Sequence, residues 1–139
     1  MGMTTVVEQV AGTPPIAILT LAGELDASNY EALIDNVTKA YAAGARGLVL
    51  DLTGLSFMAS SGFVALFAAE RIMRGDPPPD TEAGWQTIHE MEAEDARAAN
   101  VRLAGVQEAV RRILDRTGLS RLFPMDQDRR AAIAALQGA

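Results

Sequence analysis

The sequence predicts an α/β fold built on a mixed sheet of about five strands. Apolar, β-branched runs alternate with segments of helical spacing, in the order strand, strand, helix, strand, helix, strand, helix, strand, helix. One run, Gly47 to Leu52, is almost continuously apolar, which is typical of a strand that helices bury on both faces. Alternation of this kind favours parallel strands joined by helical crossovers.

The N-terminal part predicts a β-hairpin followed by a helix. Residues 4–10 and 16–22 are β-branched and apolar, and the segment between them contains two prolines that cannot continue a ladder. Ser28 or Asn29 can cap the helix that follows, and Gly44 suits its end. Apolar residues recur along it at helical spacing: Tyr30, Leu33, Ile34, Val37 and Tyr41.

The second half predicts two further β-α units and an interruption. Residues 53–59 read as a short loop after the buried strand, and a helix begins near Ser61. Three consecutive prolines at 77–79 must break this helix, and an acidic, helix-prone stretch follows over residues 85–99. The remaining elements are a strand at 101–104, an amphipathic helix at 107–117, an edge strand at 122–125 and a last helix from Asp128 to Leu136.

Composition bounds the function classes. A chain of 139 residues, 49% hydrophobic and 22% charged, favours one globular domain over residues 1–139. A net charge of -6 makes nucleic acid and anionic membranes poor partners. The absence of cysteine excludes disulfides, catalytic thiolates and zinc-cysteine sites. Neither a signal-peptide pattern nor an apolar run of about 18 residues is present, so we expect a cytoplasmic protein without a membrane span.

No convergent catalytic or metal-binding set can be found in the sequence. The single histidine, His89, has no evident partner group, and we interpret it as a solvated or half-packed side chain. The carboxylates at 90, 92, 94 and 95 do not converge on one side of a helix, so they indicate a solvated acidic face. Phosphate-binding loops and dinucleotide fingerprints are absent. We therefore expect neither an enzyme nor a cofactor.

The pair Ser60 and Ser61, followed by Gly62, lies at the start of the second predicted helix and allows two interpretations. One serine can simply cap the helix. Alternatively, a serine at this place is a phosphorylation switch, because a phosphate at a helix N-terminus meets free backbone N–H groups and the positive end of the dipole. The residues alone leave both interpretations open.

Four ordered segments resemble the STAS domain family, and specifically bacterial anti-sigma factor antagonists. The run from Leu48 to Gly62 (LVLDLTGLSFMASSG) resembles the family signature most closely. The other segments are LAGELD at 21–26, VRLAGV with VRRIL at 101–106 and 110–114, and TGLSRLF at 117–123. The resemblance covers nearly the whole chain apart from residues 74–99, and it implies a STAS-like sheet with helices packed mainly on one face.

The resemblance implies a protein-binding switch. In such proteins the unphosphorylated domain binds an anti-sigma factor, typically a serine/threonine kinase, and so frees a sigma factor for transcription, often in a stress response. Phosphorylation breaks the complex, and a PP2C-type phosphatase reverses it. By motif position the phosphoacceptor is Ser60. The partner-binding residues are Asp26, Ala59, Ser60, Ser61, Gly62 and Phe63, and a monomer or weak dimer is expected.

Two departures from the family pattern keep a second role open. The family usually carries an acidic residue just before the phosphoacceptor, where this chain has Ala59. It also crosses from the second helix to the fourth strand in a short turn, whereas this chain has an insert at 74–99, including Trp85. The alternative is a STAS accessory subunit of a lipid-transport ABC system, or a scaffold member of a stress-signalling assembly.

Overall fold

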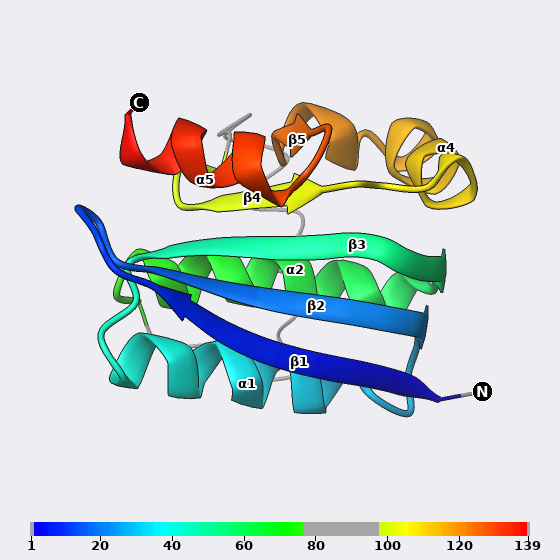
Figure 1. Ribbon diagram of the computed structural model, residues 1–139. Helices are drawn as coiled ribbons and strands as arrows, with labels where there is room; N and C mark the ends of the chain where they lie inside the picture. The colour runs from blue at the N-terminus through cyan, green and yellow to red at the C-terminus, as the bar shows by residue number, and fades with distance from the viewer. Residues whose placement is uncertain (1, 77–97, 139) are drawn as a thin grey trace.

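The computed structural model describes residues 2–76 and 98–138 and contains a five-stranded mixed sheet with helices on both of its faces (Figure 1). The elements are β1 (Met3–Val10), β2 (Ile16–Leu25), α1 (Tyr30–Ala42), β3 (Gly47–Met58), α2 (Ser60–Met73), β4 (Val101–Ala104), α4 (Glu108–Thr117), a 3-10 turn (Leu119–Arg121), β5 (Met125–Asp126) and α5 (Arg129–Gln137). The strand order is β1-β2-β3-β4-β5; β1 is antiparallel to β2 and the other pairs are parallel. This confirms the predicted α/β class and strand number.

Strand β3 extends further than its sequence suggests. We expected a loop over residues 53–59, but the strand continues to Met58 beside β2. Leu55 and Met58 are buried, and Gly54 lies so close to β2 that an added Cβ would be 3.0 Å from the Cβ of Ala22. The pairing of β2 with β3 contains two register shifts in this region, and each places one extra residue on β3. The prediction of a loop was wrong because Thr53 and Gly54 are common in turns.

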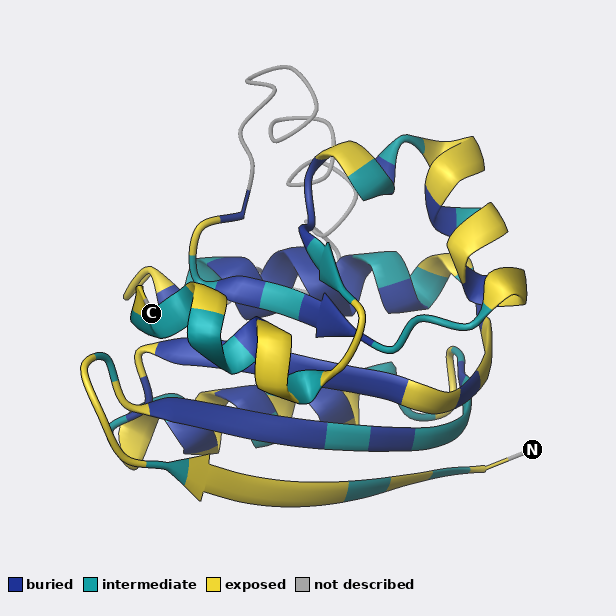
Figure 2. Ribbon diagram, turned by 45° about the horizontal axis from the view of Figure 1, so that its top comes forward, coloured by how far each residue is buried: buried dark blue, intermediate teal, exposed yellow. Residues whose placement is uncertain are grey.

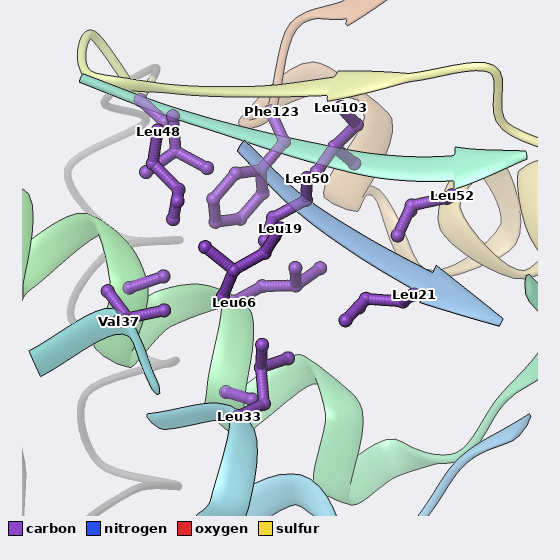
Figure 3. Packing of buried hydrophobic residues seen from close by; sticks show 14 of the residues in the cluster. Leu19, Leu21, Leu33, Val37, Leu48, Leu50, Leu52, Leu66, Leu103 and Phe123 are labelled. Atoms are coloured by element: carbon purple, nitrogen blue, oxygen red, sulfur yellow. The ribbon is translucent and has the colours of Figure 1, made fainter. Parts of the chain in front are cut away.

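The main core lies between the sheet and the two helices α1 and α2, which cover one of its faces (Figures 2 and 3). Leu48, Leu50 and Leu52 alternate along β3 and point toward this core. The residue between the first two, Val49, belongs to a smaller cluster on the opposite face, with Ala132 of α5. The continuous apolar run of β3 is thus explained by helices on both sides of the central strand.

Arg129, the first residue of α5, fastens this helix to the second face of the sheet. Its guanidinium donates to Asp51 Oδ2 at 2.9 Å, Glu8 Oε1 at 3.0 Å and Thr20 Oγ1 at 2.7 Å. Burial raises the pKa of the Asp51 carboxyl, but hydrogen bonds from Thr53 and Arg129 outweigh that effect, so the pKa lies below its ordinary value. The predicted cap is confirmed, because the Asp128 side chain accepts from the Ala131 N–H at 2.9 Å.

The strand expected at residues 122–125 is shorter and begins later. Leu122 and Phe123 precede β5 and are buried in the main core, where the Phe123 ring packs edge-on against Phe67 at a centroid distance of 5.6 Å. The strand itself comprises only Met125 and Asp126. An apolar pair just before a strand has the same composition as the strand, which accounts for the misplaced boundary.

The two ends of the predicted insert meet at Glu70, a buried acid on α2. Its side chain is 2% exposed, and its Oε1 accepts from the Ala99 N–H at 3.4 Å, while Oε2 has no hydrogen-bond partner among residues 2–76 and 98–138. Burial raises the pKa of this carboxyl above its ordinary value. Residues 98 and 99 are not helical, and most of the helix expected over 85–99, with Trp85 and His89, lies outside the described residues.

Candidate functional site

The candidate site lies at the edge of the sheet where β2 and β3 end side by side (Figure 1). Leu25 and Met58, the last residues of these parallel strands, are paired in register. Asp26 follows the first strand and Ala59 follows the second, and the Ala59 N–H donates to the Leu25 carbonyl at 2.8 Å. The register therefore brings the segment of Asp26 and the segment of Ser60 to one edge, as expected for carboxyl ends of parallel strands.

Asp26 is held in the turn between β2 and α1 by its own neighbours. Its Oδ1 accepts from the Ser28 N–H at 2.9 Å and from the Ser28 hydroxyl at 2.5 Å, and its N–H donates to Asn29 Oδ1 at 3.0 Å. The side-chain and backbone hydrogen bonds from Ser28 lower the pKa of the Asp26 carboxyl. Asp26 thus presents a fixed negative charge at the edge of the sheet at neutral pH.

Asn29 precedes α1 but does not cap it with its side chain. The residue occupies the N-cap position, as one of our two alternatives placed it, yet its side chain makes no capping hydrogen bond. Instead its amide donates to the Glu24 carbonyl at 2.9 Å, while its Oδ1 is engaged by Asp26. The amide therefore stabilises the turn that carries Asp26 rather than the helix.

Ser60 is the first residue of α2, and its side chain is exposed. The N-cap is Ala59, and no side-chain capping hydrogen bond is formed at this end. A capping role for the serine, one of the two interpretations of the sequence, is therefore not what the structure contains. The first turn of α2 also carries no acidic side chain of its own next to the free N–H groups and the positive end of the helix dipole.

Ser61 and Gly62 complete the first turn and face inward. Ser61 Oγ is buried and has no hydrogen-bond partner in the described part of the chain. Gly62 is buried against the strand ends, because an added Cβ would lie 2.6 Å from Met58 Cγ and 3.0 Å from Leu25 Cδ2. The glycine is thus required by packing, and it fixes the start of α2 against the ends of β2 and β3.

Two aromatic side chains flank the start of α2 with its two serines, residues 60–62, which we call the serine turn. Phe63 is partly buried and packs against the main core. Phe57, near the end of β3, is 43% exposed and is one of three large hydrophobic residues exposed in the described ranges. Sequence reasoning missed Phe57 because the segment was taken for a loop; its exposure would follow from reading Leu55 and Met58 as the buried positions of a continuing strand.

Residues 2–76 and 98–138 contain neither a metal site nor a helix that could span a membrane. Within these ranges, no group of three or more His, Asp or Glu side chains is arranged to hold a metal ion. None of the described helices has the length and hydrophobicity needed to cross a bilayer. Two open hollows of about 370 and 380 Å³ lie away from the serine turn, the first beside Pro15 and Ala45 and the second beside Gly105 and Asp126.

Comparisons with solved structures give the same fold. The chain is similar to an anti-sigma factor antagonist from Mycobacterium paratuberculosis, with a TM-score of 0.68, 22% identity and coverage of 98% of this chain and 95% of that one. It is also similar to the anti-sigma factor antagonist SpoIIAA in its unphosphorylated form, with a TM-score of 0.54, 19% identity and coverage of 96% and 100%. For the phosphorylated form of Bacillus SpoIIAA, the TM-score is 0.50 and the identity 19%, with coverage of 92% of this chain and 97% of that one.

Sequence comparison gives a match to one family model. No curated protein sequence matches the chain. The family model of the STAS domain, however, matches residues 8–74, which include β2, β3, the serine turn and α2. Residues 8–74 are therefore similar to a STAS domain, and the fold of nearly the whole chain is that of the solved antagonists.

Proposed function

We propose that this protein is an anti-sigma factor antagonist, and that phosphorylation of Ser60 switches it off. The observation that carries the proposal is the exposed Ser60 hydroxyl, which begins α2 without capping it. A serine in a structural role would be engaged with the helix end. The likeness to antagonists supports the general role, and one of them, SpoIIAA, exists in a phosphorylated and an unphosphorylated form.

The chemistry of the switch follows from the position of Ser60. A kinase-type anti-sigma factor would transfer the γ-phosphoryl group of ATP to Ser60 Oγ. The bond from the γ-phosphorus to the bridging oxygen breaks, ADP leaves, a phosphate ester forms and the hydroxyl proton is released. The product carries about -1.5 to -2 charges at neutral pH. The N–H groups and dipole of the first turn of α2 can receive that charge without unfolding the helix. A PP2C-type phosphatase would restore the hydroxyl by hydrolysis.

The effect on a partner is electrostatic. Asp26 already holds one negative charge at this edge, because its carboxyl pKa is lowered. A phosphate on Ser60, at the start of α2, would add its charge to a surface where Asp26 and the exposed Phe57 already lie. A partner that docks its own apolar surface on Phe57 and Phe63 would then have to bury uncompensated charge, which is unfavourable.

The proposal is tested by binding and phosphorylation assays with kinase-type anti-sigma factors from the same genome. Wild type incubated with such a kinase and ATP should gain one phosphate by intact-mass spectrometry, and Ser60→Ala should gain none while still binding. Ser56→Ala is the matched control, since this exposed serine lies near the end of β3, its hydroxyl donates to the Gly23 carbonyl, and its loss should leave phosphorylation intact. A phosphate that persists in Ser60→Ala would refute the assignment.

Ala59 offers a second arm of the same experiment. The N-cap position of α2 lacks the acidic residue that related antagonists usually carry there. If that acid serves kinase recognition, Ala59→Asp should raise the phosphorylation rate and leave binding of the unphosphorylated protein unchanged. Absence of both binding and phosphorylation with every such kinase would instead favour the alternative role, as an accessory subunit of a lipid-transport ABC system or a scaffold member of a stress-signalling assembly.

A further inference from the structure

We propose that the free edge of β1 pairs with the same edge of a second copy of this chain, joining the two sheets into one. Among the described strands, β1 is the outermost one and is paired on the side of β2 alone (Figure 1). The opposite edge of the sheet ends in β5, a strand of two residues. Only β1 therefore offers a long row of unpaired backbone N–H and C=O groups among the described strands, and such a row is a template for a further strand.

The edge lacks the features with which proteins usually prevent such pairing. β1 has eight residues (MTTVVEQV), and these include neither lysine nor proline. Its register with β2 shows no bulge. Val6 is 55% exposed and Val7 46%, and Figure 2 shows the strand largely open to solvent. Glu8 is the only charged residue, and Arg129 of the same chain binds it at 3.0 Å. These properties favour association through this edge.

The hydrogen-bonding pattern determines which pairing is possible. The Gly2 carbonyl accepts from the Glu24 N–H at 3.4 Å, so the backbone groups of even-numbered residues are directed to β2. The groups of the odd-numbered residues then point outward, because they alternate along an antiparallel strand. Two copies can exchange these outward groups around a two-fold axis at Val6, where each Val6 faces its counterpart, Thr5 faces Val7, Thr4 faces Glu8 and Met3 faces Gln9.

The charges permit a second copy in this register. With the axis at Val6, each Glu8 lies opposite a threonine, and no like charges meet across the new ladder. With the axis at Glu8, two carboxylates would face each other, which is destabilising. Centring on Val6 also places the exposed valine side chains in contact at the closest type of antiparallel pair.

The size of the contact sets its strength. A contact through an edge of eight residues buries less surface than an interface of standard size, which buries about 800 Å² on each partner. We therefore expect a weak dimer whose population depends on concentration. The serine turn follows β3, two strands away from β1, so pairing leaves it accessible. The inference accordingly does not rest on the proposed antagonist role.

Cysteine trapping tests the register, and the chain contains no native cysteine. In the proposed dimer the two Val6 Cα atoms are about 4.5 Å apart, within the range of about 4.4–6.8 Å that a disulfide spans. Val6→Cys should therefore form a covalent dimer rapidly under mild oxidation. Ala135→Cys, at an exposed position of α5, is the matched control and should remain monomeric. Equal trapping of the two variants would overturn the proposal.

Sedimentation equilibrium provides an independent readout. Wild type should show reversible dimerisation, and Val6→Lys should weaken it by about tenfold or more, because two ammonium groups would meet at the axis. Ala135→Lys carries the same charge change elsewhere and should dimerise like wild type, with circular dichroism confirming that all three are folded. A wild type that stays monomeric at all concentrations, or a dimer insensitive to Val6→Lys, would overturn the inference.

Discussion

Gly62→Ala and Ser61→Ala are expected to change stability in opposite directions, although both place alanine in the first turn of α2. Intrinsic helix propensity favours both changes, and it favours the glycine replacement more, by up to about 1 kcal/mol. The packing at the strand ends reverses this order. A Cβ on Gly62 would lie 2.6 Å from Met58 Cγ and 3.1 Å from Leu25 Cγ, which are inner atoms of buried side chains.

The magnitudes follow from these contacts. Overpacking of this kind costs about 1–3 kcal/mol, so Gly62→Ala should be less stable than wild type by about 1 kcal/mol after the propensity gain is subtracted. Ser61→Ala removes a buried hydroxyl that has no hydrogen-bond partner among the described residues. Its removal should raise the free energy of unfolding by about 0.5–1 kcal/mol, since no bond is lost and a desolvated polar group disappears.

Urea denaturation followed by circular dichroism measures both variants. With m-values of about 1–3 kcal/mol/M, the two midpoints should differ by roughly 0.5–2 M, with wild type between them. Unchanged m-values would show that the effects lie in the folded state. If Gly62→Ala proves as stabilising as propensity alone predicts, the close approach of α2 to the ends of β2 and β3 is refuted, and with it the account of why a glycine follows the serines.

Three further predictions concern ionised groups. Because the Glu70 pKa is raised on folding, the folded state holds the proton more tightly, and stability should fall as pH rises above about 4.5. Glu70→Gln should abolish this dependence on pH. By thermal denaturation at pH 7, the variant should be more stable than wild type. Ser28→Ala should move the Asp26 pKa upward toward its ordinary value in a carbon-detected NMR titration, since Ser28 supplies the bonds that lower it. Arg129→Ala should lower the free energy of unfolding by about 1–3 kcal/mol, because the buried carboxylate of Asp51 loses its partner. Arg112→Ala removes an exposed ion pair within α4 and should lower the free energy of unfolding by less than about 0.5 kcal/mol. Equal urea midpoints for the two arginine variants would contradict this difference.

The sequence determined the class of fold because its strongest signals are local. The apolar run at Gly47 to Leu52, the prolines after Ala11 and the capping residue Asp128 each predict one element, and the structure contains all three. The boundaries that failed depend on tertiary contacts. β3 continues past Thr53 because β2 lies beside it, and no pattern within residues 53–58 encodes that neighbour.

The candidate site was predictable only in part. The resemblance to STAS domains drew attention to Ser60 and Asp26, and parallel register explains why their segments share one edge. That Ala59 occupies the N-cap position of α2, and that Ser61 Oγ is buried with no hydrogen-bond partner among the described residues, depends on how the helix enters the core. The exposure of Phe57 depends on the length of β3, which the sequence analysis predicted to be too short.

The burial of α2 has a consequence for the speed of signalling. Ten of its fourteen residues are buried, and Ser60, its first residue, is exposed. A helix so enclosed by close-packed side chains can move only if its neighbours repack as well. Under the proposed function, a phosphate on Ser60 would alter the surface without a structural rearrangement, so the response time of the switch would be set by the kinase and the phosphatase alone. The domain would add no delay and keep no memory of its previous state.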